Sequence, residues 1–206
     1  MRTFIVVGHR ATTSPDFSLE DIPGTSGRLD ILCRCINAAF VLSHGIRKDV
    51  RVLLILLGGE APKTVYLRGE DLRHLNPDER TTAALLKKAL TLSAAQEWMM
   101  STSGIFVRNG GLSDLLKDEL LKGSKLFYLR EDGRDIRQAG RLTSFPSDAA
   151  FILGDHLGMI PDEEELIEQA GAKTISVGPV SLHADHCIVL INNELDIEAQ
   201  ANGDSE

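Results

Sequence analysis

The chain has few cysteines and no long apolar run. Its 206 residues include three cysteines, an odd number that argues against a disulfide framework and suits a reducing compartment. No apolar stretch approaches the roughly 18 residues that would span a bilayer. The N-terminal residues MRTFIVVGHR become polar too early for a signal peptide. We therefore expect a cytoplasmic protein that does not enter the membrane.

Common nucleotide-binding and hydrolase motifs are also missing. No G-x-G-x-x-G follows the first predicted strand, and neither G-x-x-x-x-G-K-[ST] nor G-x-S-x-G occurs. These motifs are typical of dinucleotide-binding Rossmann domains, P-loop NTPases and serine hydrolases. Their absence removes most of the support for those three classes.

Positive charge is scarce at the C-terminal end. The net charge of −8 argues against a nucleic-acid partner, because phosphate binding depends on Lys and Arg. From Asp155 onward, however, twelve acidic residues accompany the single basic residue Lys173, so this part carries −11 and the rest about +3. Residues 1–51 contain seven basic and five acidic side chains. That excess fits either an anionic partner or ordinary surface charge.

Apolar runs alternate with helical patterns along the chain. We predict strands at 3–7, 50–57, 64–67, 105–107, 125–129, 149–153 and 173–177. We predict helices at 28–44, 76–92, 113–121, 161–171 and from 184 to 194 or beyond, with a long loop at 9–27 and a frayed tail. Asn76 is the predicted cap of the second helix, with Pro77 at its first position. The pattern predicts one α/β domain over 1–206, with a mostly parallel sheet and helices on both faces.

Ligands of such sheets bind beyond the carboxyl ends of the strands. Two glycine-bearing apolar turns lie at such ends, in ILGDHLG around Gly154 and in SVGPVSL around Gly178. Main-chain groups in these turns can approach a flat ligand such as adenine while Leu and Val flank it. The residues alone leave open the simpler explanation that both glycines merely end strands.

Four segments carry a family resemblance that spans nearly the whole chain. In order, TSPDFSLEDIPGTSGRLDILCR, HLNPDER, FILGDHLG and SVGPVSLHADHCIVLINNELD resemble the archaeal tRNA pseudouridine N1-methyltransferases. The resemblance implies the SPOUT fold, in which residues 125–200 would bind the cofactor and form a deep trefoil knot. It also implies a homodimer, S-adenosyl-L-methionine as methyl donor, and N1-methylation of pseudouridine 54 in the tRNA T-loop by an RNA-facing N-terminal part. Methylation of rRNA by a sister SPOUT enzyme and a non-catalytic RNA-binding module remain alternatives.

The resemblance also implies cofactor contacts at specific positions. By position these are Leu129, Gly154, Val177, Gly178, Pro179, Val180, Ser181, Leu182 and Cys187. Asp185 departs from the pattern, because the family more often has a small residue such as Ser there.

Methylation of a ring nitrogen requires alignment with the methyl donor and removal of one proton. Asp30 is a candidate for assisting deprotonation, and Arg28 or Arg34 for holding a phosphate or the developing charge. Arg10 is a further candidate RNA contact. Spacing alone favours a simpler explanation, in which Asp30 is a first-turn acid that complements the helix dipole and Arg34 is a solvated side chain.

The segment His183-Ala184-Asp185-His186-Cys187 contains residue types that bind zinc. No second ligand pair such as C-x-x-C accompanies it, so we predict no metal site. Cys187 is a conceivable nucleophile for carbon methylation, but its place at the entry of an apolar helix favours packing near the cofactor.

Overall fold

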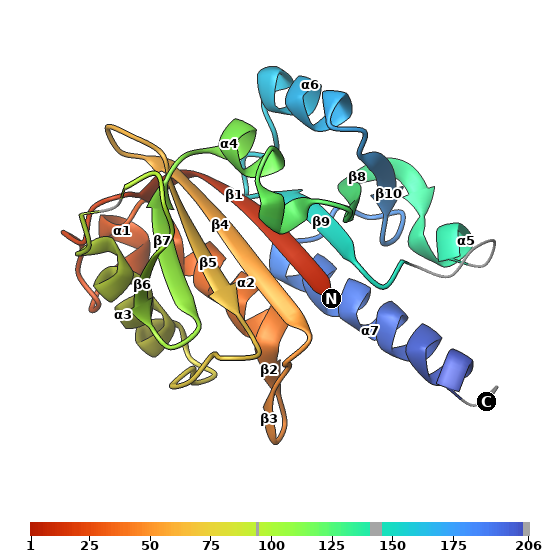
Figure 1. Ribbon diagram of the computed structural model, residues 1–206, viewed down its shortest axis with the longest axis horizontal. Coiled ribbons are helices and arrows are strands. Elements are labelled where there is room, and N and C mark those ends of the chain that lie inside the picture. Colours follow the sequence, from red (N-terminus) through yellow and green to blue (C-terminus); the bar gives the residue numbers. More distant parts are fainter. Residues whose placement is uncertain (94, 141–145, 204–206) are drawn as a thin grey trace.

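The computed structural model describes residues 1–93, 95–140 and 146–203, and these form one large sheet flanked by helices (Figure 1). Its strands are β1 (Arg2–Thr12), β4 (Val50–Gly58), β5 (Lys63–Arg68), β6 (Met99–Thr102), β7 (Ile105–Asn109), β8 (Lys125–Asp135), β9 (Ala149–Gly154) and β10 (Lys173–Ser176). A separate hairpin consists of β2 (Val41–Leu42) and β3 (Gly45–Ile46). The helices are α1 (Ile22–Thr25), α2 (Leu29–Phe40), α3 (Glu79–Leu90), α4 (Leu112–Leu116), the 3₁₀ helix η1 (Glu119–Leu121), α5 (Ile136–Gly140), α6 (Pro161–Gln169) and α7 (Ala184–Gly203).

The eight-stranded sheet combines a parallel half with an antiparallel half. The strand order is β10-β8-β9-β1-β4-β5-β7-β6. The neighbours from β10 to β4 pair in parallel, and β5, β7 and β6 are added by antiparallel pairing. The predicted α/β class with a mostly parallel sheet is confirmed.

Both faces of the sheet carry an apolar core, because side chains alternate between the faces of a strand. In β1, Phe4 and Val6 pack with α2, α3 and α7, whereas Ile5 and Val7 pack with α4 and α6 on the opposite face. These four β1 side chains are fully buried. This double burial explains why the central strands read as nearly continuous apolar runs. Within the described residues, no helix combines the length and the apolar character needed to cross a bilayer.

Several element boundaries differ from the prediction. The predicted loop 9–27 contains the end of β1 and the short helix α1, and α2 ends at Phe40, where the β2–β3 hairpin begins. The cap of α3 is Asp78 instead of Asn76, because the Asp78 carboxylate accepts the Thr81 amide at 2.8 Å. The cap predicted at Ser113 is also wrong, since α4 begins at Leu112 after Gly111. The last helix continues to Gly203.

Candidate active site

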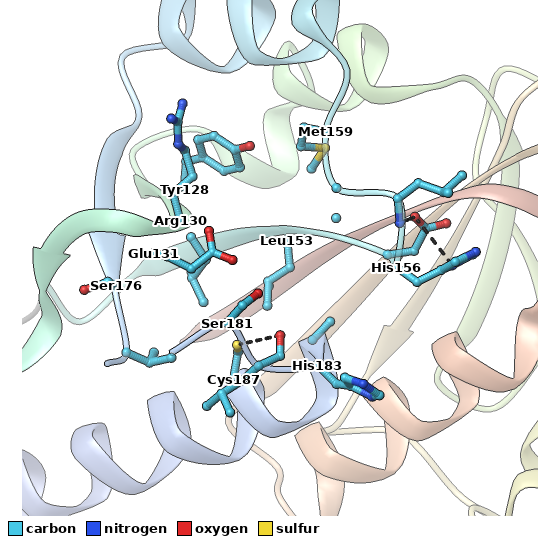
Figure 2. A pocket seen from close by; sticks show the side chains of 18 of the residues that line it. Tyr128, Arg130, Glu131, Leu153, His156, Met159, Ser176, Ser181, His183 and Cys187 are labelled. Carbon is cyan, nitrogen blue, oxygen red and sulfur yellow. Dashed lines mark hydrogen bonds and ion pairs between the residues drawn. The ribbon is translucent and has the colours of Figure 1, made fainter. Parts of the chain in front are cut away.

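A cavity of about 840 Å³ lies beside the middle of β8 and at the carboxyl ends of β9 and β10 (Figure 2). Its size is in the range of small-molecule sites, which is roughly 300–1,000 Å³. Residues 128–131, 153–159 and 180–184 line it together with Arg28, Ile31, Arg34, Glu164, Ser176, Val177, Gly178 and Cys187. Segments far apart in the sequence therefore meet where an open α/β sheet places its ligand.

A bulge in β8 forms one wall of the cavity. Tyr128 pairs with Thr174, whereas the next residue of β10, Ile175, pairs with Arg134. Residues 129–133 therefore leave the ladder, as the extra residues of a bulge do. Gly133 permits this path, because a Cβ there would lie 2.5 Å from the Ile175 carbonyl carbon. The bulge is why residues 129–131 line the cavity.

Gly154 makes a close main-chain contact on the opposite wall. A Cβ on Gly154 would lie 2.7 Å from the Gly158 carbonyl carbon and 2.8 Å from its oxygen. Asp155 fixes this turn, because its carbonyl accepts the Gly158 amide at 3.1 Å and its Oδ1 accepts the Leu157 amide at 2.9 Å. Gly154 therefore does more than end a strand. Gly178 differs, since no described atom lies within 4 Å of the position of its missing Cβ.

Aliphatic side chains exposed in a concave site form the next wall. Val180 is 65% exposed and Leu182 39% exposed, and both line the cavity with Leu129 and Leu153. Exposed apolar groups beside main-chain turns suit the face of a flat, partly apolar ligand. An adenosyl group fits this combination.

Carboxylates and their donors give the cavity a polar side. The Ser181 hydroxyl donates to Glu131 and lowers the pKa of that carboxyl, and both side chains point into the same part of the cavity (Figure 2). The Tyr128 hydroxyl donates to Glu164 at 2.8 Å, and Arg130 approaches the same carboxylate at 3.3 Å. Burial and the bond to Glu164 raise the pKa of Tyr128, so its phenol remains a donor. The cavity thus presents negative charge on the side of β8 and α6.

Arg28, the N-cap of α2, and Arg34, within that helix, both line the cavity and share one buried acid. Arg28 holds Asp30 through two bonds of 3.0 and 3.1 Å, and Arg34 contacts it at 3.2 Å. Burial alone raises the pKa of Asp30, but the hydrogen bonds and charges of the two arginines outweigh it and lower that pKa. Arg28 also has φ 72°, a left-handed conformation that non-glycine residues rarely adopt outside constrained sites. The geometry directs two guanidinium groups toward the cavity.

The comparisons with known proteins agree with this arrangement. Residues 1–200 match the family model described as "Putative SAM-dependent RNA methyltransferase". The chain belongs to this family.

Two similar proteins are each named tRNA (pseudouridine(54)-N(1))-methyltransferase. The protein of Methanococcoides burtonii is 52% identical over 197 residues, which cover 95% of this chain and 96% of that protein. The protein of Methanosarcina acetivorans is also 52% identical, with 95% of this chain and 91% of that protein covered. The resemblance seen in the sequence motifs is therefore confirmed.

A solved structure shares the fold of this family member. Archaeoglobus fulgidus Nep1 bound to S-adenosylhomocysteine superposes with a TM-score of 0.63, covering 97% of this chain and 98% of that one. The sequence identity is 15%, so the likeness is one of fold.

The structure brings most of the predicted cofactor residues of this family member together. Leu129, Gly154, Val177, Gly178, Val180, Ser181, Leu182 and Cys187 line the cavity, and Pro179 lies exposed between two of them. Of the predicted RNA-binding residues, Arg28 and Arg34 line the cavity, and the predicted catalytic residue Asp30 is buried behind them at 2% exposure. Arg10 is exposed and lies outside the lining.

Sequence reasoning missed the polar residues on the β8 and α6 side. Arg130 directly follows the predicted strand 125–129, and ligands of α/β sheets bind at such strand ends, so the pattern gave a signal for it. Glu131 and Glu164 carry no such signal, because their approach to the cavity depends on the β8 bulge and on how α6 packs.

Cys187 lines the cavity as a protonated thiol. Burial, with the charges of Asp185 and Glu131, raises the pKa of Cys187 to about 11, and its Sγ lies 3.9 Å from the Leu182 carbonyl oxygen (Figure 2). Such a thiol is a poor nucleophile. Nearby, the rings of His183 and His186 stack with centroids 5.6 Å apart. Within the described residues, no three side chains of the metal-binding types form a group that could hold an ion.

Proposed function

We propose that this chain transfers a methyl group from S-adenosyl-L-methionine to N1 of pseudouridine 54 in tRNA. The observation that carries the proposal is the 52% identity to a protein named for this reaction, over 95% of this chain and 96% of that protein. The residues matched by the family model, 1–200, include every segment that lines the cavity.

The cavity has the features that the methyl donor requires. The exposed aliphatic groups of Val180 and Leu182 offer walls for adenine, and the open side of Gly178 leaves the main chain accessible. We assign the predicted contacts, from Leu129 and Gly154 to the 177–182 stretch and Cys187, to donor binding. When bound, the donor supplies an electrophilic methyl group on a sulfonium centre.

Arg28 and Arg34 are assigned to the tRNA side of the cavity. Their guanidinium groups suit a phosphate of the flipped nucleotide or the charge that develops on the base as N1 loses its proton. Arg10 supplies a further contact to the RNA. Asp30 is 2% exposed and holds both α2 arginines. Its lowered pKa makes it a weak base, so we assign it to positioning the arginines instead of to proton removal.

Further features follow from the family assignment as expectations. We expect the 206 residues to form one cytoplasmic SPOUT domain with its trefoil knot in the C-terminal part, and to act as a homodimer.

The test is methyl transfer to two tRNAs that differ only at position 54. The chain is incubated with labelled donor and with tRNA carrying either pseudouridine or uridine there. We expect label to enter only the pseudouridine-containing tRNA and to reside on N1. Equal labelling of both tRNAs would contradict the choice of base, and a chain that neither binds the donor nor transfers a methyl group would favour an RNA-binding module.

A further inference from the structure

His9 is held between two acidic side chains beside the cavity. Its Nδ1 lies 3.1 Å from Asp155 Oδ1 and its Nε2 lies 2.9 Å from Glu163 Oε2. The His9 main-chain amide also donates to Asp155 Oδ2 at 2.8 Å. All three side chains are nearly buried, with exposures of 12% for His9, 5% for Asp155 and 9% for Glu163.

Two ionised carboxylates on one ring favour a charged imidazole. An ionised carboxylate only accepts hydrogen bonds, and a neutral imidazole has one N–H to donate. Both contacts of His9 are therefore satisfied when both ring nitrogens carry a proton. Burial lowers the pKa of His9, but the hydrogen bonds and charges of Glu163 and Asp155 outweigh it and raise that pKa above its usual value.

The two carboxylates also organise the segment that they bracket. Asp155 Oδ1 accepts the Leu157 amide at 2.9 Å, and Glu163 Oε2 accepts the Ile160 amide at 3.1 Å. Residues 155–159 line the cavity. A cation at His9 therefore links both ends of a loop that forms one wall of the site, without itself belonging to the lining.

We infer that His9 is a positioning residue whose charged form holds the 155–163 segment in place against the methyl-donor cavity. The inference rests on the proposed function. Other charged groups face the same carboxylates: Arg28 interacts electrostatically with Asp155, and His156 Nδ1 lies 3.9 Å from Asp155 Oδ1. On α6, Glu164 follows Glu163 and points to Tyr128 and Arg130.

The consequence for pH follows from the direction of the pKa shift. Because the pKa of His9 is raised, the charged ring bridges Asp155 and Glu163 fully below the ordinary histidine pKa of about 6.5. The bridge is lost as pH rises through the raised pKa. Donor affinity then falls with increasing pH. We expect the donor affinity to fall about tenfold, which is the effect expected from the loss of one charge-assisted hydrogen bond.

The experiment is calorimetric titration of the full-length chain with S-adenosyl-L-methionine from mildly acidic to alkaline pH. Wild type is expected to show the tenfold fall, and His9→Gln a weak affinity that does not vary with pH. His44→Gln changes an exposed histidine between β2 and β3 and is expected to retain the wild-type profile. An equal fall in His9→Gln and wild type would overturn the inference.

If His9→Gln does not fold, a second variant still tests the inference. Glu163→Gln places an amide donor beside His9, so a neutral imidazole can accept there while it donates to Asp155. Because one atom, Glu163 Oε2, accepts both His9 and the Ile160 amide in wild type, the variant loses the Ile160 bond. We therefore expect a weaker affinity at acidic pH that does not fall further as pH rises, and a wild-type fall in this variant would contradict the inference. A wild-type chain that binds no donor at any pH would instead overturn the proposed function. Donor binding that is independent of pH in wild type would overturn only the role of His9.

Discussion

Replacing Gly154 by alanine is expected to distort the turn that forms one wall of the cavity. The added Cβ would lie 2.7 Å from the Gly158 carbonyl carbon, whereas ordinary contacts begin at 3.4 Å. The turn must therefore move by several tenths of an ångström, against the two bonds that Asp155 makes to it. Overpacking of this kind costs about 1–3 kcal/mol. A displaced turn also no longer fits the donor, so we expect its affinity to fall at least about tenfold, which corresponds to roughly 1.4 kcal/mol.

Chemical denaturation measures the free energy of unfolding, and calorimetric titration with S-adenosyl-L-methionine measures the affinity. Gly178→Ala is the matched control for folding, because no described atom lies within 4 Å of its added Cβ. Its stability should stay within about 0.5 kcal/mol of wild type. If Gly154→Ala were as stable as wild type and bound the donor equally well, the close main-chain contact would not shape the site.

Two further substitutions test the assigned roles. Asp30→Ala removes the anchor of Arg28 and Arg34, so tRNA methylation should fall by about tenfold or more, while donor affinity measured by titration stays near wild type. A tenfold loss of donor affinity with unchanged turnover would contradict the positioning role. Cys187→Ala should still methylate pseudouridine-containing tRNA, because a thiol whose pKa is about 11 does not act as the nucleophile. Complete loss of transfer with intact donor binding would revive a covalent step.

The sheet was predictable because its signals are local. Neighbours such as Val6 and Val7 in β1 lie on opposite faces and are both buried, and the VRVLLILL run of β4 is almost wholly apolar. Burial of both faces occurs in parallel sheets covered by helices. Ligands of open α/β sheets bind beyond the carboxyl ends of the strands. The predicted strand ends at Gly154 and near Val177 therefore indicated where the cavity lies. The detailed residue set came from the family resemblance.

The missed features depend on contacts between distant residues. The length of β8 was underestimated because its bulge depends on the close approach of Gly133 to Ile175 in β10. The end of α2 at Phe40 depends on the hairpin that follows, where the Phe40 carbonyl accepts the Arg47 amide at 2.8 Å. The place of Asp30 behind two arginines depends on the left-handed conformation of Arg28. No short window of sequence contains these constraints.

The most direct measurement is a crystal structure of the chain with S-adenosylhomocysteine, the product form of the donor. We expect its adenine to lie between Leu129 and the 177–182 stretch, with main-chain contacts near Gly154. Its sulfur should face the part of the cavity nearest Arg28 and Arg34. Electron density for the ligand at any other place on the chain would contradict the central claim that the bulge of β8 and the carboxyl ends of β9 and β10 form the methyl-donor site.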